Sequence, residues 1–333
     1  MQKKVGRIRD VAHAVGLSIA TVSRVVNGAE NVSPKTRERV LQACKDLNYL
    51  PNPAAKALST SRVKTIAAII PTIEHSIFAK TIAAIEQALS DRGYSLVLAI
   101  SNGDEAQELD AARKLLGMGA EAFILSGAVH SQELAELFAR RGVPHVFTSV
   151  WDPRNPTPTI GYDNFGLAAL AIDFLAGHGH RNIAVVHGPL IDSDRTRARR
   201  AGAESALTGD MRMGFFETGL DVAGGKAAVD GLLAPGGNHT AILCLSDVLA
   251  LGVYFGLAKA GLSVPDDISV MGFDNLDWSS ETEPPLTTLN LPAGRMGTEV
   301  ATQLMDHLDF QKPIDPEHLS GRIVERQSVR HLA

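Results

Sequence analysis

Between Thr65 and the C-terminus, short apolar runs alternate with longer amphipathic segments. The apolar runs are rich in β-branched residues and have no polar face, as strands buried on both sides do; they are TIAAII, YSLVLAI, AFILSG, HVFTSV, NIAVVHG, AILCLS and ISVMGFD. The intervening segments, such as Ile77 to Asp91 and Glu105 to Leu116, repeat apolar residues at helical spacing. This alternation predicts an α/β fold with doubly wound parallel sheets.

The strand and helix pattern divides into two series. The segment PTPTIGYDNF near residue 160 separates them, TTLNLPAGRMG later leads into another helix, and GRIVERQSV can supply a last strand pairing. We therefore expect a two-lobed core over 64–333, with an N-lobe of about 64–161 plus 292–322 and a C-lobe of about 162–291 plus 323–333. In such folds a ligand binds between the lobes, at the carboxyl ends of the strands.

The first fifty residues have a different pattern, which predicts three short helices: Ile8 to Val15, Ser18 to Val26 and Pro34 to Leu47. Ser18 is an N-cap residue, and Ser33 before Pro34 is the favoured start of a helix. The turn VGLS joins the first two helices into a helix-turn-helix. We predict a small all-α headpiece over 1–50, followed by a hinge helix and linker over 51–63.

The second predicted helix consists largely of β-branched residues, which lose side-chain freedom in a helix. Val22, Val25 and Val26 can pack inward, and Thr21 and Ser23 offer short polar groups. A helix held in the major groove by packing and by DNA tolerates such low propensity. The alternative interpretation is a plain three-helix core with Ser and Thr on its surface.

Base contacts can be assigned along the same helix. The guanidinium of Arg24 suits a bidentate contact to guanine, while Ile19 and Ala20 offer apolar contact to a thymine methyl.

The charge is distributed unevenly along the chain. Residues 1–62 hold eleven Lys and Arg against four Asp and Glu, a net charge of +7, whereas the remainder carries −12 and the chain −5. Because these basic residues are interspersed with apolar periodicity, we favour a nucleic-acid-binding domain over a solvated tail.

The segment from Ile8 to Leu58 resembles the headpiece and hinge of the LacI/GalR family of bacterial transcription regulators. The matching motifs are DVA, TVSRV, LNY and the PN of Pro51 and Asn52. Individual residues between these motifs also match: Asn27, Ser33, Thr36 and Arg37. The resemblance implies that positions 19, 20 and 24 read bases, and that phosphates are contacted by Thr21, Ser23, Asn27, Ser33 and Thr36.

The stretch PNPAAKALS is similar to the hinge helix of that family, which folds when two subunits meet on a pseudo-palindromic operator. The resemblance places Asn52 and Ala55 against DNA and makes Leu58 the side chain that wedges into a central base step from the minor groove. Lys56 stands where many members have arginine, so its phosphate contact can differ.

The resemblance continues through the periplasmic-binding-protein-like core and so covers the entire chain. Arg199 matches an arginine that grips sugar hydroxyls or an anionic group, and Asp274 matches an effector-binding aspartate. We consider Arg195, Arg197 and Arg200 more typical of a solvated helix face.

Several positions depart from the family pattern or match it less firmly. Ser246 stands where asparagine is usual, Ser149 stands where some sugar-responsive members have aspartate, and Ala293 replaces an aromatic residue of some relatives. The ligand should therefore differ from that of the best-known members. The remaining candidate effector contacts are Ile77 and Phe78, for which core packing is an equal alternative, and Asp163 at a crossover between lobes.

Enzyme and metal motifs fail on inspection. No GxGxxG follows a strand, GLDVAGGK misses the Walker A spacing, and no nucleophile elbow is present. GHGHR places His178 and His180 two residues apart without a third ligand nearby, which favours a structural role. We expect no catalytic residues, no metal and no cofactor.

The sequence also indicates where the protein acts and how many copies assemble. The two cysteines indicate neither disulfides nor zinc, and no run resembles a signal peptide or membrane helix, so we expect a cytoplasmic protein without membrane contact. Because no C-terminal heptad segment is seen, a homodimer is favoured over a tetramer.

We thus expect a DNA-binding regulator, favoured as a repressor, that responds to a small effector such as a carbohydrate. A purine, a sugar phosphate or another non-sugar metabolite is the alternative ligand. A free-standing sugar-binding receptor and an enzyme are the alternatives from other functional classes.

Overall fold

The computed structural model describes residues 6–27, 31–50, 62–74, 76–191, 193–234 and 237–332. The chain divides into two compact units, Met1–Lys64 and Thr65–Ala333. Each unit has its own hydrophobic core, and each is described separately below.

The first unit is a three-helix domain formed by α1 (Ile8–Val15), α2 (Ile19–Val26) and α3 (Pro34–Asp46). Gly16 ends α1 in a left-handed conformation, and Ser18 caps α2 by accepting a hydrogen bond from the Thr21 amide. These two residues produce the sharp turn between the helices. The core is formed by buried apolar side chains of all three helices: Val11, Ala12, Val15, Val22, Val25, Val40 and Ala43.

The first lobe of the larger unit contains a six-stranded sheet in the order β11-β5-β4-β3-β1-β2. Every described strand pair in it is parallel. Its strands are β1 (Thr65–Ile70), β2 (Ser95–Ile100), β3 (Ala122–Ser126), β4 (His145–Thr148), β5 (Thr159–Gly161) and β11 (Glu317–His318).

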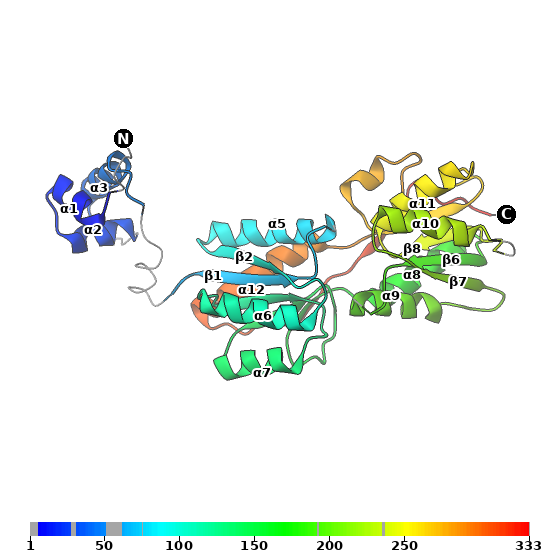
Figure 1. The fold of residues 1–333 in the computed structure, drawn as a ribbon, viewed down its shortest axis with the longest axis horizontal. Helices are drawn as coiled ribbons and strands as arrows, with labels where there is room; N and C mark the ends of the chain where they lie inside the picture. Colours follow the sequence, from blue (N-terminus) through cyan, green and yellow to red (C-terminus); the bar gives the residue numbers. More distant parts are fainter. Residues whose placement is uncertain are drawn as a thin grey trace. The chain divides into compact units, whose positions relative to one another are not determined.

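Helices cover both faces of this sheet. They are α5 (Ser76–Asp91), α6 (Glu105–Gly117), α7 (Gln132–Arg141) and α12 (Ala293–Phe310). The strands β1 and β2 lie between the helices α5 and α6 in Figure 1. Successive residues of β1 point to opposite faces of the sheet. Ile66 belongs to the core that includes α5 and α12 residues, and Ala67 belongs to the core under α6 and α7. Burial on both faces explains why the β1 sequence is apolar throughout.

The second lobe has the same plan, with a sheet in the order β12-β10-β9-β8-β6-β7. Its strands are β6 (Asn182–His187), β7 (Arg212–Glu217), β8 (Ala241–Cys244), β9 (Ser269–Asp274), β10 (Thr287–Asn290) and the antiparallel β12 (Arg322–Val324). The helices α8 (Asn164–Gly177) and α9 (Asp194–Ser205) lie on one face, and α10 (Val222–Leu232) and α11 (Asp247–Lys259) on the other (Figure 1). A short 3-10 helix, η1, spans Asp277–Ser280.

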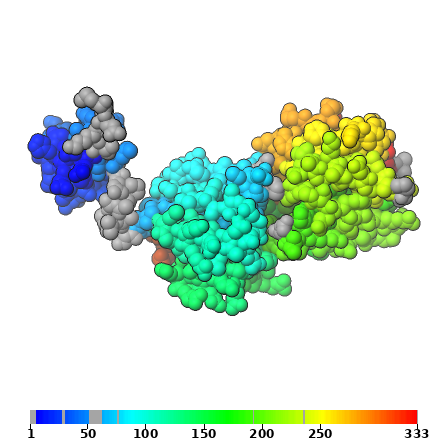
Figure 2. All heavy atoms as spheres, viewed as in Figure 1, coloured from blue at the N-terminus to red at the C-terminus, as the bar shows by residue number. Residues whose placement is uncertain are grey.

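Within the described residues, the chain crosses between the two sheets after β5, after β10 and after β11. The two lobes lie side by side in the space-filling view, coloured cyan to green and green to orange (Figure 2). All seven apolar runs named above contain a strand, and the last pairing predicted in GRIVERQSV is β12. The short strands β5, β10 and β11 and the edge strand β7 were not predicted.

Candidate functional site

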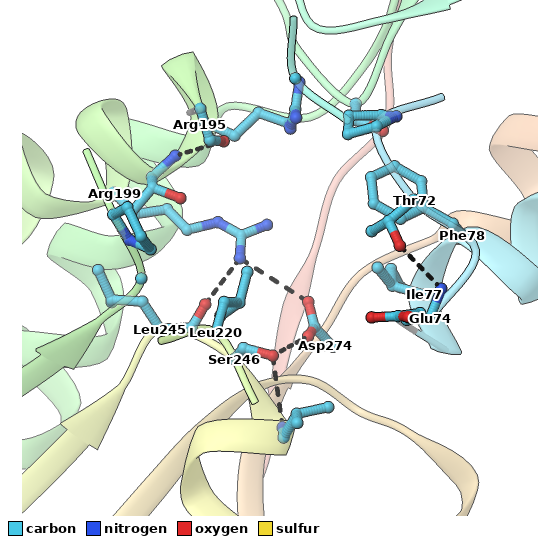
Figure 3. Close-up of a pocket in the computed structure, with 18 of the residues that line it drawn as sticks. Thr72, Glu74, Ile77, Phe78, Arg195, Arg199, Leu220, Leu245, Ser246 and Asp274 are labelled. Carbon is cyan, nitrogen blue, oxygen red and sulfur yellow. Dashed lines mark hydrogen bonds and ion pairs between the residues drawn. The ribbon is translucent and has the colours of Figure 1, made fainter. Parts of the chain in front are cut away.

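A cavity of about 380 Å³ opens between the lobes, where segments that follow strands of both sheets face each other (Figure 3). Pro71 and Thr72 follow β1, Leu245 and Ser246 follow β8, and Asp274 ends β9. The cavity thus lies at the carboxyl ends of parallel strands, where ligands bind in doubly wound folds.

Arg199, on α9, extends its guanidinium toward the cavity (Figure 3). Its Nε donates to Asn164 Oδ1 at 2.9 Å, its Nη1 donates to the Leu245 carbonyl at 2.8 Å, and Nη1 lies 3.8 Å from Asp274 Oδ1. The guanidinium also stacks over the Phe273 ring at 4.0 Å. Among the described residues Nη2 has no hydrogen-bond partner. The side chain is held in place through Nε and Nη1, and it presents the two N–H groups of Nη2 to a ligand.

Asp274 and Glu74 are acidic residues that line the cavity, and Asp274 is 5% exposed. Burial raises the pKa of its carboxyl; the nearby Arg199 cation opposes that shift, and Asp247 adds to it. The backbone is strained here, with φ of 133° at Asp274 and 54° at Asn275. Buried Asp247 supports this turn, since its Oδ2 accepts a 2.8 Å hydrogen bond from the Leu276 amide.

Ser246 links this acidic group to helix α11. Its hydroxyl donates to Asp274 Oδ2 at 2.9 Å and accepts a hydrogen bond from the Val248 amide at 3.3 Å, as the N-cap of α11. The short serine side chain is therefore occupied by the protein itself. A ligand meets the Ser246–Asp274 pair as one polar unit.

The opposite wall of the cavity is mixed, with polar groups from Thr72 and Glu74 beside an apolar surface. Ile77 and Phe78, near the start of α5, line it across from Arg199 and Asp274 (Figure 3). Ile77 also packs against the hydrophobic core of the lobe, which agrees with the alternative predicted for this residue.

The headpiece presents a second candidate surface on α2. Val22 and Val25 point into the core, whereas Ala20 and Arg24, one helical turn apart, are exposed. Ile19, at the first position of the helix, is 46% exposed. An exposed large apolar side chain beside an exposed arginine suits a surface that reads base edges.

Comparisons with known proteins cover both units. Residues 7–52 match the bacterial regulatory proteins of the lacI family, and residues 172–329 match a periplasmic binding protein-like domain. Catabolite control protein A of Priestia megaterium is 32% identical over 97% of this chain and 99% of that protein. This chain belongs to the lacI family of bacterial regulatory proteins.

Two further similarities agree with the lacI family. The HTH-type transcriptional repressor PurR of Histophilus somni is 32% identical over 98% of this chain and 99% of that protein. The crystal structure of the Lac repressor dimer bound to operator and the anti-inducer ONPF is 29% identical with a TM-score of 0.88, covering 98% of this chain and all (100%) of that one. The predicted family and fold class are confirmed, and the chain is a DNA-binding transcriptional regulator with a ligand-binding domain.

Six of the seven predicted effector residues line the cleft of this lacI-family core: Ile77, Phe78, Ser149, Arg199, Ser246 and Asp274. Asp163 does not join them among the described residues. Its carboxylate instead caps α8 by accepting a 3.0 Å hydrogen bond from the Gly166 amide. A ligand role for Asp163 therefore finds no support, because its side chain has a structural role at the helix start.

The prediction that Arg195 lies on a solvated helix face is wrong. Its side chain is 11% exposed, lines the cavity and pairs with Asp194 at 3.0 Å, and burial lowers its pKa. Asp194 in turn accepts a 2.7 Å hydrogen bond from the Ala128 amide, which joins the two lobes. The exposed Arg197, by contrast, fits the prediction.

Sequence reasoning also missed Asn164, the first residue of α8. Its Nδ2 donates to the Ser149 carbonyl at 2.8 Å, and its Oδ1 accepts from Arg199. Ser149 itself adopts a left-handed conformation, with φ of 65°. Asn164 follows a predicted lobe crossover directly, and that position is the signal that could have identified it.

Each predicted phosphate contact of the headpiece is hydrogen-bonded to another polar side chain, which for Thr21 is the N-cap Ser18. The Ser18 and Thr21 hydroxyls lie 2.9 Å apart, and the Ser33 hydroxyl donates to Thr36 Oγ1 at 2.9 Å. Within α2 and its C-cap, Asn27 Nδ2 donates to Ser23 Oγ at 3.2 Å. The predicted hinge contacts, Asn52, Ala55 and Leu58, lie outside the described residues, as does Lys56.

None of the helices in the described ranges is both long enough and apolar enough to cross a membrane.

Proposed function

We propose that this protein is a repressor that binds operator DNA through α2 of its headpiece and responds to an uncharged polyhydroxylated ligand, a carbohydrate or related polyol, in the cleft between its lobes. The observation that carries the ligand class is the group formed by Arg199, Asp274 and Ser246. It offers donors and acceptors side by side, as adjacent hydroxyl groups require.

The chemistry of the cleft fits such a ligand. Asp274 can accept two hydroxyl hydrogen bonds, and Arg199 Nη2 can donate to a ring or hydroxyl oxygen beside them. Ile77 and Phe78 supply an apolar surface for the C–H face of a sugar. The volume of about 380 Å³ falls at the lower end of the usual range for small-molecule sites.

Charge argues against an anionic ligand as the first choice. The two arginines that line the cavity already have carboxylate neighbours, Asp194 beside Arg195 and Asp274 beside Arg199. A phosphate would have to displace one of these neighbours or be repelled by it. A purine remains the second candidate, since the similarity to PurR favours it and Asp274 can accept from a ring N–H.

We propose that the protein binds a pseudo-palindromic operator as a homodimer. The edge strand β2 presents Leu98 and Ile100 on one face, 40% and 42% exposed. Such a paired apolar surface on a sheet edge suits burial against a second copy. A regulator of this kind acts on chromosomal DNA in the cytoplasm and uses neither a catalytic residue nor a cofactor.

Coupling between ligand and DNA requires that they favour different lobe arrangements. Lobe contacts that can change lie at the rim of the cleft. Lys80 of α5 pairs with Asp277 at 2.6 Å and donates to the Asn275 carbonyl at 3.3 Å, next to Asp274. A ligand on Asp274 therefore acts beside a contact that joins the lobes.

Thermal unfolding of the full chain against sugars, polyols, sugar phosphates and purines tests this proposal. A specific ligand raises the unfolding midpoint by mass action, and we expect one carbohydrate or polyol to do so. Arg199→Ala should abolish the shift while operator binding, measured by fluorescence anisotropy, persists. A shift from a purine or a sugar phosphate alone would overturn the proposed ligand class.

A further inference from the structure

A cluster of metal-ligating side chains lies in the second lobe, apart from the ligand cleft. It joins three separate parts of the chain: His178 at the end of α8, Glu325 just after β12, and His331 near the C-terminus. One ligand atom from each lies within 4.8 Å of the others. The sequence shows only the histidine pair in GHGHR, because the other two ligands follow nearly 150 residues later.

His178 and His180 have different surroundings, which separates their roles. Both ring nitrogens of His180 have partners, Thr240 Oγ1 at 2.9 Å and the Arg330 carbonyl at 3.1 Å. For His178, Nδ1 donates to the Phe174 carbonyl at 2.9 Å, while Nε2 has no hydrogen-bond partner within the described part of the chain. His180 thus has the structural role predicted for both histidines, while His178 has a structural contact through Nδ1 and leaves Nε2 open to a ligand.

The Nε2 atom of His178, which has no hydrogen bond within the described residues, is placed to act as a ligand to a cation. The residue is 8% exposed, and a neutral ring that donates through Nδ1 presents a bare lone pair at Nε2. That lone pair lies 3.5 Å from a carboxylate oxygen of Glu325, so two electron-pair donors face each other. A ring that donates through its other nitrogen to a carbonyl is the usual arrangement of a metal-bound histidine.

We propose that His178, Glu325 and His331 bind a divalent transition-metal ion of the Zn²⁺ type. Two imidazoles and one carboxylate form a common three-ligand set for Zn²⁺, with water in the fourth position. Ligand atoms of a tetrahedral site lie about 3.3 Å apart, close to the 3.5 Å between His178 and Glu325.

The backbone around the cluster is well fixed, and its two outer ligands can adjust. The Leu332 amide donates to the His178 carbonyl at 2.8 Å, which holds the C-terminal segment against the end of α8. The His331 ring stacks on His178 at 4.0 Å, so it must turn from this position to point a nitrogen at the ion. This turn costs little, because His331 and Glu325 are both exposed. The bound ion would fasten the C-terminal segment to the lobe.

Calorimetric titration of the chelator-treated, tag-free full chain with ZnCl₂ tests the site. We expect saturable binding of one ion per chain, with MgCl₂ giving none because Mg²⁺ prefers oxygen ligands. His331→Ala and Glu325→Gln alter exposed side chains, so they should fold normally, and each should weaken Zn²⁺ binding by at least about tenfold. The matched control is His318→Ala, an exposed histidine of the other lobe, which should bind Zn²⁺ like the unaltered chain.

A second readout identifies the ligands directly. Co²⁺ in place of Zn²⁺ should give the intense visible absorption of a tetrahedral site, and Glu325→Gln and His331→Ala should remove it. Two results would overturn the proposal: no saturable binding of Zn²⁺, which would leave His178 and Glu325 as an ion pair only, or binding that both variants leave unchanged.

Discussion

The hydroxyl of Ser246, which follows β8, donates a 2.9 Å hydrogen bond to Asp274 at the end of β9. Because this bond favours the charged carboxylate, it partly offsets the burial that raises the pKa of Asp274. The pair therefore determines how much the charged form of Asp274 costs in the folded protein, and this cost can be measured through the pH dependence of stability.

Ser246→Ala should lower the free energy of unfolding more at about pH 8.5 than at about pH 5. Folding raises the pKa of the Asp274 carboxyl above its value in the unfolded chain. Its contribution to the free energy of unfolding is therefore fully present below the pKa of the unfolded chain, and it is lost as the pH rises through the pKa of the folded chain. Without Ser246 the pKa of Asp274 rises further, and we expect an added loss of about 1.5–3 kcal/mol at the higher pH.

The measurement is urea unfolding at both pH values, with Ser246→Thr as the control that keeps a hydroxyl. Ser246 also caps α11, and loss of a cap is independent of Asp274 charge. Equal losses at the two pH values would therefore assign the whole effect to the cap.

Asn164 and Arg199 should be energetically coupled. The Asn164 side chain accepts from Arg199 Nε and donates to the Ser149 carbonyl, so its removal leaves buried groups without partners. In a double-mutant cycle of Asn164→Ala and Arg199→Ala, followed by urea unfolding, we expect a coupling energy of about 0.5–3 kcal/mol. Asn164→Asp keeps an acceptor for Arg199 and is the matched comparison. Additive losses would show that Asn164 does not position the arginine.

Much of this arrangement follows from sequence pattern, and the exceptions have physical causes. Ser18, Gly16 and the inward valines determine α2 locally, so its bounds were predicted within one residue. The edge strand β7, with the sequence RMGFFE, lacks β-branched residues and is only half buried, so no apolar run marks it. The prediction for Arg195 was wrong, and the helix cap formed by Asp163 was not foreseen, because sequence spacing does not show which side chains face another lobe or cap a helix. The cluster around His178 depends on contacts between distant segments, which no local pattern contains.

Arg24→Ala should weaken binding to the true operator by about 1–3 kcal/mol and relax the preference at one base pair. The side chain is exposed on α2, so its loss should not disturb the headpiece core. Fluorescence anisotropy on operators with single base changes provides the measurement. Thr36→Ala is the comparison, since loss of a phosphate contact should weaken binding to all sequences alike. If Arg24→Ala did the same, its proposed role in reading a base would be wrong.

Leu58→Ala should reduce operator affinity by lowering the bend that the protein imposes on DNA. A leucine that wedges between two base pairs unstacks them, which costs free energy. The resulting bend brings more of the duplex into contact with the protein, and this added contact offsets the cost. Bending is measured by energy transfer between dyes at the operator ends, and ligand binding by thermal shift should stay unchanged. An unaltered bend would make Leu58 a spacer between the two units.

His187 should make the larger unit sensitive to acid. It ends β6, is 1% exposed, and donates through Nδ1 to the Gly188 carbonyl at 2.8 Å; burial lowers its pKa. The unfolded chain takes up a proton on His187 near pH 6.5, and the folded chain does so only at lower pH. The free energy of unfolding should therefore fall as the pH drops from about 6.5.

His187→Asn keeps a donor at the Nδ1 position. It should reduce the slope of the unfolding free energy against pH, by an amount that corresponds to the uptake of up to about one proton on unfolding. His318→Asn, which changes an exposed histidine, should leave the slope unchanged. A slope that His187→Asn does not alter would place the acid sensitivity at other histidines, such as the half-buried His145, whose pKa burial also lowers.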